Sequence, residues 1–322
     1  MRPTRSQPDV PALVQAARSG SPRAVARLIT LVENAHPTLR EVMAALAPHT
    51  GQARVVGLTG SPGVGKSTST AMLVRAFRDQ GLRVGVLAVD PSSPFSGGAL
   101  LGDRIRLVDH ALDPGVYIRS MASRGHLGGL AWATPQALRV LDGAGCEVIL
   151  VETVGVGQSE VEVAGEADTT VVLLAPGMGD GVQAAKAGIL EIGDVFVVNK
   201  ADRDGADVTV RELRHMISLG DRTAPGLWRP PVLKTIADRG EGFVEVIEAL
   251  DKHAAWLQDS GELERRRRSR AEREIEALAM VQLRSRMGEL AGGTLIGQLA
   301  AAVASGEIDP YTAADQVLAD LG

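Results

Sequence analysis

Aromatic residues are scarce in this sequence, at 3% of 322 residues, and cysteine is nearly absent. With so few rings, the core must be packed mainly by valine, leucine, isoleucine and alanine. The single cysteine, Cys146, excludes an intramolecular disulfide and fits a protein of the reducing cytosol, and we interpret it as a small buried residue. Basic residues are not in excess either. The formal net charge of −5 argues against a general nucleic-acid binder.

Long hydrophobic runs are also missing. No apolar stretch approaches the roughly 20 residues that a membrane-spanning helix needs. The N-terminal segment MRPTRSQPDVPALVQAARSG lacks the apolar centre of a secretory signal. We therefore expect a cytoplasmic protein without a membrane partner.

Short apolar runs follow one another from Arg54 onward. RVVGLTG, RVGVLAVD, EVILVET, TTVVLLAP and DVFVVNK are each brief and apolar, and helical patterns separate several of them. This order is typical of an α/β protein whose mainly parallel central sheet is buried on both faces. Because ligands bind beyond the carboxyl ends of such strands, the polar residues that follow the strands are the candidates for function.

Helical segments flank this region on both sides. Residues 1–50 carry apolar residues at helical spacing, with Ser21 and Pro22 as a predicted helix start. Residues 258–322 begin with a charged, proline-free stretch that predicts a long helix, which leaves 51–257 as the central domain that carries the sheet. The arginine run at 265–268 is interleaved with glutamates, so we interpret it as a solvated helix face rather than a nucleic-acid patch.

A glycine-rich loop follows the first apolar run. Residues 60–67 read GSPGVGKS and match G-x-x-x-x-G-K-[ST], with a strand pattern before and a helix pattern after, as in P-loop NTPases. Glycines let the backbone N–H groups turn toward phosphates, and the following helix N-terminus favours negative charge. Lys66 would contact the β- and γ-phosphates, and Ser67 would place its hydroxyl on Mg²⁺. The predicted phosphate-binding residues are Gly60, Ser61, Pro62, Gly63, Val64, Gly65, Lys66, Ser67 and Thr68.

A second motif, Asn199-Lys200-Ala201-Asp202, follows the run DVFVVNK and matches N-K-x-D. Guanine offers its N1–H and N2–H₂ donors to one carboxylate and adenine does not, so a site built on Asp202 can discriminate by roughly 10⁴ or more. Lys200 would cover the base plane, and Asn199 would tie this loop to its neighbours. A further strand, VLKTIA, would bring Thr235, Ile236 and Ala237 to the base from the other side.

Three acids stand where a metal beside nucleotide phosphates would lie. Asp90 ends RVGVLAVD, Glu152 lies in EVILVET, and Asp103 lies in the loop SSPFSGGALLGDRIR. Mg²⁺ takes octahedral oxygen ligands and keeps several waters, so one or two of these acids would bind it directly, together with Ser67. A salt-bridged acid is the alternative for each of them, most of all for Asp103, whose next neighbour is an arginine.

Two glycine-rich segments provide candidate switches. ETVGVGQ resembles the D-x-x-G segment of GTPases with glutamate replacing aspartate, and Gly155 could donate its N–H to the γ-phosphate, so that loss of the phosphate releases the loop. Gln158 could orient the attacking water or be an ordinary surface residue. In MGDGVQAAKAG, Lys186 could reach the nucleotide or a partner, or be a solvated helix lysine.

Together these segments resemble the MeaB/ArgK family of GTPases. The resemblance rests on GSPGVGKST, VDPSSPFSGGALLGDRIR, RSMASRGHLGGL, ETVGVGQSE and NKAD, and it extends over nearly the whole chain. It implies a homodimeric GTP-binding and GTP-hydrolysing chaperone that loads and protects an adenosylcobalamin-dependent acyl-CoA mutase, typically methylmalonyl-CoA mutase. It also implies that Asp180 and Lys186 lie in an additional switch and that the C-terminal helices form the dimer.

Hydrolysis of GTP to GDP and phosphate would rest on positioning and charge, with Lys66, Glu152 and Asp103 as the predicted catalytic residues. No arginine stands out as a second catalytic charge. Candidates are Arg104, Arg106 and Arg124, for which local ion pairs are the alternative. We therefore expect slow turnover alone and faster turnover with a partner. The competing interpretations are an ATP-using kinase or transport-associated ATPase, and a mainly structural partner whose hydrolysis is vestigial.

Overall fold

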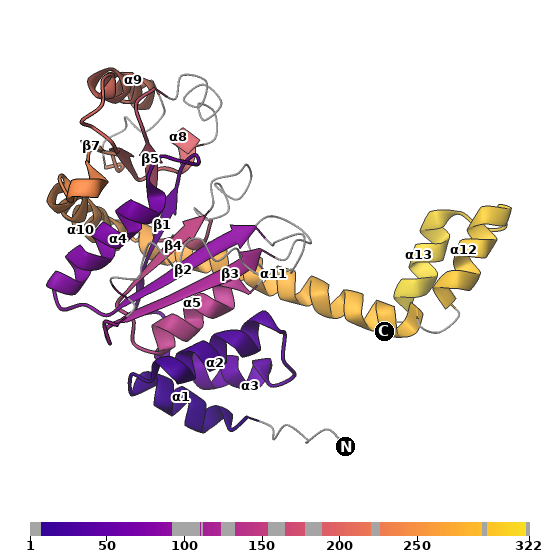
Figure 1. Cartoon of the computed structure of the whole chain (residues 1–322). Helices are drawn as coiled ribbons and strands as arrows, with labels where there is room; N and C mark the ends of the chain where they lie inside the picture. The colour runs from indigo at the N-terminus through magenta and orange to yellow at the C-terminus, as the bar shows by residue number, and fades with distance from the viewer. Residues whose placement is uncertain are drawn as a thin grey trace. The chain divides into compact units, whose positions relative to one another are not determined.

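In the computed structural model, residues 8–91, 110, 112–123, 133–153, 165–177, 189–219, 226–291 and 295–319 are described. The chain divides into two units, residues 1–264 and 265–322 (Figure 1). The first unit carries the sheet and every described residue of the predicted nucleotide motifs.

A 7-stranded sheet organises the first unit, with strand order β3-β2-β4-β1-β5-β6-β7 and parallel pairing throughout. Its strands are β1 (Arg54–Thr59), β2 (Val84–Pro91), β3 (Val116–Ser123), β4 (Val148–Thr153), β5 (Thr169–Leu174), β6 (Val195–Val198) and β7 (Val232–Lys234). This arrangement confirms the predicted α/β fold of the P-loop NTPases with a parallel central sheet. It also places the carboxyl ends of all strands at one edge.

Both faces of the sheet are buried, which explains the continuous apolar runs of its strands. On β4, Val148 and Leu150 join one hydrophobic cluster, and Ile149 and Val151 join another. Two helices, α4 (Lys66–Asp79) and α10 (Phe243–Asp259), pack their apolar residues against the strands in the first cluster. A third cluster packs α9 (Ala206–Ser218) on the β5–β7 part of the sheet, where α8 (Ile189–Ile192) adds a contact.

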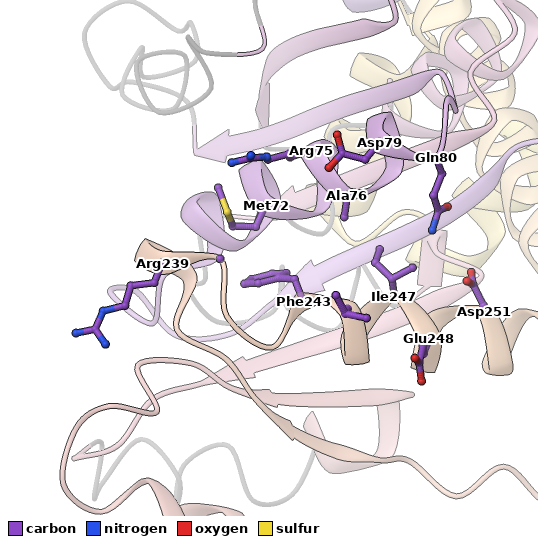
Figure 2. A pocket seen from close by; sticks show the side chains of 12 residues that line it. Met72, Arg75, Ala76, Asp79, Gln80, Arg239, Phe243, Ile247, Glu248 and Asp251 are labelled. Carbon is purple, nitrogen blue, oxygen red and sulfur yellow. The ribbon is translucent and has the colours of Figure 1, made fainter.

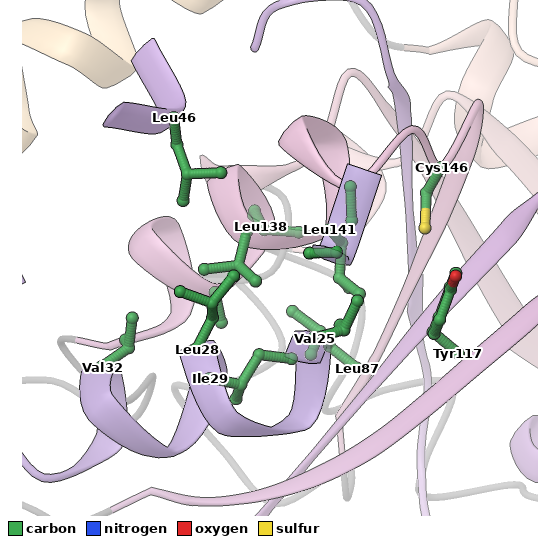
Figure 3. Packing of buried hydrophobic residues seen from close by; sticks show 14 of the residues in the cluster. Val25, Leu28, Ile29, Val32, Leu46, Leu87, Tyr117, Leu138, Leu141 and Cys146 are labelled. Carbon is green, nitrogen blue, oxygen red and sulfur yellow. The ribbon is translucent and has the colours of Figure 1, made fainter. Parts of the chain in front are cut away.

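The N-terminal helices cover the second face together with α5 (Thr134–Gly143) (Figure 1). They are α1 (Val10–Arg18), α2 (Pro22–Glu33) and α3 (Leu39–Leu46), followed by the short turn η1 (Ala47–His49). The Ser21 hydroxyl accepts from the Ala24 N–H, which confirms the predicted start of α2. Figure 3 shows Leu28 and Ile29 of α2 packed among Leu46, Leu138 and Leu141, so the N-terminal helices share a core with the sheet.

The second unit is helical. The helix α11 (Glu262–Ala291) begins at the end of the first unit, and α12 (Leu295–Ser305) and α13 (Pro310–Ala319) follow it. The long predicted helix is therefore confirmed. Apolar side chains on α11 stand exposed, namely Ile275, Leu278, Met280, Val281 and Leu283. Within the described part of the chain, no helix combines the length and apolar character that crossing a membrane requires.

Two strands differ from expectation. The edge strand β3 was not predicted, because its sequence VYIRSMAS carries Arg119 and Ser120 and lacks a continuous apolar run. An edge strand tolerates such residues, and Arg119 forms an ion pair with Glu33 of α2. The predicted strand VLKTIA is shorter than expected, since β7 ends at Lys234. The following Ile236 bridges instead to Glu241 and turns the chain toward α10.

Candidate functional site

The loop between β1 and α4 folds back tightly on its neighbours. Gly60 has a φ of 142°, and a Cβ there would lie 2.2 Å from the carbonyl oxygen of Leu173 on β5. Gly65 has a φ of 98°, and its Cβ would lie 2.3 Å from the side-chain nitrogen of Asn199. Both positions therefore need glycine for conformation and for space. The backbone of the loop is pressed between β5 and the loop after β6.

Lys66 closes this loop on itself. It is the first residue of α4, and only 7% of it is exposed. Its ammonium donates to the carbonyl oxygens of Gly60, at 2.6 Å, and Ser61, at 3.1 Å. The positive charge is thus held under the loop, at the positive end of the α4 dipole, where an anion would be stabilised.

Glu152 receives two hydroxyl groups from α4. Glu152 lies on β4, which runs between β1 and β2, and it is in register with Leu58 and Ala88. Its carboxylate contacts the start of α4. The Ser67 hydroxyl donates to Oε1 at 2.7 Å, and the Thr70 hydroxyl lies 2.9 Å from Oε2. Only 4% of Glu152 is exposed. Sequence reasoning missed Thr70, although its place one helical turn after Lys66 puts it on the same face of α4.

Asn199 joins three segments of the site. Its side-chain nitrogen donates to the Val64 carbonyl at 2.8 Å. Its side-chain oxygen accepts from the Thr235 hydroxyl at 3.2 Å and from the Ala237 N–H at 3.0 Å. With 2% of the residue exposed, these contacts are shielded from water. The phosphate-type loop, the N-K-x-D segment and the segment after β7 therefore meet at one buried amide.

The neighbouring residues of the N-K-x-D segment adopt special positions. Lys200 has a φ of 57°, in the left-handed region, and its ammonium donates to the Gly63 carbonyl at 2.6 Å. The side chain of Asp202 is 40% exposed and has Arg239 at 3.9 Å. Arg239 was not predicted, because it becomes a neighbour of Asp202 only through the turn η4 (Ala237–Arg239). Among the predicted base contacts, Thr235 and Ala237 are buried and Ile236 is half-buried.

Several predicted residues cannot be placed in this geometry. Asp90 lies at the end of β2, in register with Ala122, and its side chain is outside the described residues. The remaining predicted positions outside the described residues are Asp103, Arg104, Arg106, Arg124, Gly155, Gln158, Asp180 and Lys186. Within the described ranges, no three His, Cys, Asp or Glu side chains gather as a metal cluster.

A separate cavity of about 560 Å³ lies between α4 and α10. Figure 2 shows Met72 and Ala76 of α4 facing Phe243 and Ile247 of α10, with charged side chains around them. Arg239 lines this cavity and also lies beside Asp202. The cavity therefore borders the predicted base-reading segment without including the phosphate-type loop.

Known proteins resemble this chain over most of its length. The sequence model of the family described as methylmalonyl-CoA mutase-associated GTPase MeaB matches residues 25–291. A putative GTPase of Pyrococcus abyssi is 47% identical, with 96% of each chain covered. The GTPase ArgK of Escherichia coli is 37% identical, with 80% of each chain covered. The mitochondrial methylmalonic aciduria type A homolog of Mus musculus is 38% identical, over 78% of this chain and 64% of the mouse protein.

A solved structure shares the fold as well. The crystal structure of an LAO/AO transport system kinase superposes with a TM-score of 0.70 at 27% identity, and 97% of each chain is covered. The likeness therefore includes the helical segments outside the sheet.

Proposed function

The chain belongs to the MeaB family of methylmalonyl-CoA mutase-associated GTPases, and on that premise we propose that it binds GTP at the site around Asn199 and hydrolyses it to GDP and phosphate. The observation that carries the proposal is the convergence of three nucleotide motifs on this one residue. Asn199 belongs to the segment 199–202, and its side-chain amide contacts both the loop 60–67 and the segment 235–237. A base and its phosphates can be held together only if these segments are joined.

Guanine selectivity would come from Asp202. Its carboxylate is half-exposed, and among the described residues its one ion pair is the 3.9 Å contact to the exposed Arg239, so it is accessible to a ligand. In the proposed complex it accepts the N1–H and N2–H₂ groups of guanine, whereas adenine would leave it unsatisfied. The stem of Lys200 crosses to Gly63, where it would cover the base. Thr235, Ile236 and Ala237 would line the base from the other side.

The phosphates would bind along the loop 60–67 and the start of α4. The free backbone N–H groups in the first turn of an α-helix point out of its N-terminus, toward an anion bound there, and Lys66 is the first residue of α4. On phosphate binding, its ammonium would exchange the carbonyl oxygens of Gly60 and Ser61 for phosphate oxygens. That exchange keeps the charge of Lys66 paired and places it where the γ-phosphate carries negative charge during hydrolysis.

The residues present suit a Mg²⁺ ion beside the phosphates. Ser67 and Glu152 are buried oxygen donors 2.7 Å apart, and oxygen donors are what Mg²⁺ selects. We propose that Ser67 and one or two of Glu152, Asp90 and Asp103 hold the ion, directly or through water. Bound Mg²⁺ would neutralise charge on the β- and γ-phosphates. Gly155, Gln158, Asp180 and Lys186 remain proposed switch residues that would respond to the γ-phosphate or a partner.

The partner we propose is an adenosylcobalamin-dependent acyl-CoA mutase, for which the protein would act as a chaperone. Support comes from the family description, which names methylmalonyl-CoA mutase, and from the mouse relative. We also propose a homodimer, supported by the exposed apolar side chains of α11, which a second chain would cover. Hydrolysis is expected to be slow alone and faster with the partner.

Nucleotide selectivity tests the proposed activity directly. Wild-type protein should bind GTP and GDP far more tightly than ATP, and Asp202→Asn should shift the preference toward xanthosine nucleotides, because an amide can donate to the xanthine oxygen. Asp204→Asn is the matched control, since Asp204 lies in the same exposed loop and outside the N-K-x-D segment. Titrations with fluorescent nucleotides would measure each constant. Tighter binding of ATP than of GTP would overturn the proposal in favour of an ATP-using enzyme.

The chaperone role needs a separate experiment. Mutase from the same cell should co-purify with the protein in one nucleotide state, and Lys66→Ala should lose the protection of the mutase against inactivation. If Lys66→Ala protects the mutase as well as the wild type does, nucleotide hydrolysis is not part of the role.

A further inference from the structure

Thr70 is a buried hydroxyl in the second turn of α4. None of its surface is exposed, and its oxygen lies 2.9 Å from Oε2 of Glu152 and 3.0 Å from the Lys66 carbonyl oxygen. A threonine hydroxyl has one proton to donate. Which acceptor receives it decides whether Thr70 serves the helix or the carboxylate.

The carboxylate is the stronger acceptor. Hydrogen bonds to an ionised group are roughly twice as strong as those between neutral groups. The Lys66 carbonyl already has a donor, since within an α-helix it accepts the backbone N–H four residues on, which belongs to Thr70 itself. Glu152 is almost fully buried, and hydrogen bonds to a charged group are stronger where water is excluded. The Thr70 proton therefore points to Oε2.

Two hydroxyls then fix the plane of the Glu152 carboxylate, one on each oxygen. Ser67 holds Oε1 from the first turn of α4, at the loop, and Thr70 holds Oε2 from one turn deeper. Ser67 is also the hydroxyl that would turn its lone pairs to Mg²⁺. Thr70 lies one turn deeper in α4, so it would keep its hydrogen bond to Oε2 if Ser67 turned toward a metal.

We propose that Thr70 is a positioning residue that orients Glu152 for the Mg²⁺ ion bound with the nucleotide. The inference rests on the proposed function and adds to it one residue outside the G-x-x-x-x-G-K-[ST] motif. Thr70 is expected to affect the part of nucleotide binding that depends on Mg²⁺, and not the contacts that Lys66 makes with the loop 60–67.

The experiment compares four variants with the wild type. Thr70→Val keeps the shape and removes the donor, Thr70→Ala removes it with a residue that favours helix, and Thr70→Ser restores the hydroxyl. Ser69→Ala is the matched control, because Ser69 is a buried neighbour on α4 whose hydroxyl has no hydrogen-bond partner among the described residues. Two readouts are the GDP affinity in excess chelator and the GDP affinity at saturating Mg²⁺. The third is the Mg²⁺ concentration at which the GDP affinity lies halfway between these two values.

Thr70→Val and Thr70→Ala should raise that Mg²⁺ concentration about tenfold, the effect of losing one hydrogen bond to a charged group. GDP affinity in chelator should match the wild type, Thr70→Ser should recover most of the Mg²⁺ dependence, and Ser69→Ala should leave it unchanged. Thermal unfolding checks that each variant is folded.

Three outcomes would overturn the inference. Thr70→Val and Thr70→Ala could show wild-type Mg²⁺ dependence, they could weaken binding in chelator as much as in Mg²⁺, or Ser69→Ala could match them. The last two would make Thr70 an ordinary helix-packing residue. Wild-type protein that binds no guanine nucleotide would instead overturn the proposed function, and the inference with it.

Discussion

Replacing Asn199 with alanine would remove the residue on which three segments of the site converge. The change deletes one hydrogen bond to Val64 and two from Thr235 and Ala237. The Thr235 side chain and the Ala237 N–H are buried, so water cannot easily replace the lost acceptor. With about 1 kcal/mol for each net hydrogen bond and a further penalty for buried groups left unpaired, the unfolding free energy should fall by roughly 2–4 kcal/mol.

Urea unfolding followed by tryptophan fluorescence would measure this loss, since Trp228 and Trp256 lie in the same unit. A domain with a typical stability of about 5–15 kcal/mol should remain folded without denaturant. GDP affinity should fall as well, because the loop 60–67 and the segment 235–237 are no longer tied together. Asn199→Asp separates the contributions. It keeps an acceptor for Thr235 and Ala237 but sets an oxygen against the Val64 carbonyl, so the loop contact becomes repulsive.

Asn34→Ala provides the control, because Asn34 is an exposed asparagine at the end of α2 in the same unit. Its substitution should change stability by less than about 0.5 kcal/mol. If Asn199→Ala keeps both the wild-type unfolding free energy and the wild-type GDP affinity, the buried amide does not join the site.

Two further predictions concern ionisable groups away from the site. The Arg78 guanidinium lowers the pKa of Asp113 through two hydrogen bonds, so this carboxylate should stabilise the fold above the pKa of an unfolded aspartate, about 3.9, and lose that contribution as the pH falls through its lower folded pKa. Urea unfolding between pH 2 and 7 should therefore show a weaker acid dependence for Asp113→Asn, and an identical dependence would contradict the prediction. Burial raises the pKa of the Cys146 thiol to about 12, so iodoacetamide at pH 8 should label it only after unfolding, as mass spectrometry can show. Rapid labelling of the folded protein would refute that.

Much of the fold follows from the sequence because parallel strands buried on both faces must be short, apolar and continuous. The five apolar runs and the predicted strand VLKTIA each contain a strand of the sheet, and the carboxyl ends of these parallel strands lie at one edge. β3 was not predicted because an edge strand can carry polar and charged residues, so its sequence need not be one continuous apolar run. Arg119 faces α2 there and pairs with Glu33, a contact between residues far apart in the sequence.

The site was predictable as motifs and not as contacts. The spacing of G-x-x-x-x-G-K-[ST] and N-K-x-D identifies Lys66 and Asn199, because each motif is local. Their mutual arrangement depends on strand order, which places β5 between β1 and β6. The roles of Thr70 and Arg239 follow only from the structure. The register of β4 brings Glu152 to Thr70, and the turn η4 brings Arg239 to Asp202. The helical spacing after Lys66 places Thr70 on the same face of α4 but does not name its partner, and no local pattern points to Arg239.

The central position of β1 has a consequence for how the site can work. Its loop is held at the tip by Asn199 and Lys200, through Val64 and Gly63, and at the start of α4 by Glu152, through Ser67. The segment 199–202, which we propose to read the base, and Glu152, which we propose to hold the metal, thus contact the same loop at different points, joined by the backbone that includes Gly65. Changes on one side can reach the other only if this loop moves as one piece. If Thr70 substitutions change the Mg²⁺ dependence of nucleotide binding without changing guanine selectivity, the two sets of loop contacts act independently. Sites without shared partners have additive effects. If both change together, the loop itself couples base recognition to the metal, which is the property that a nucleotide-dependent switch requires.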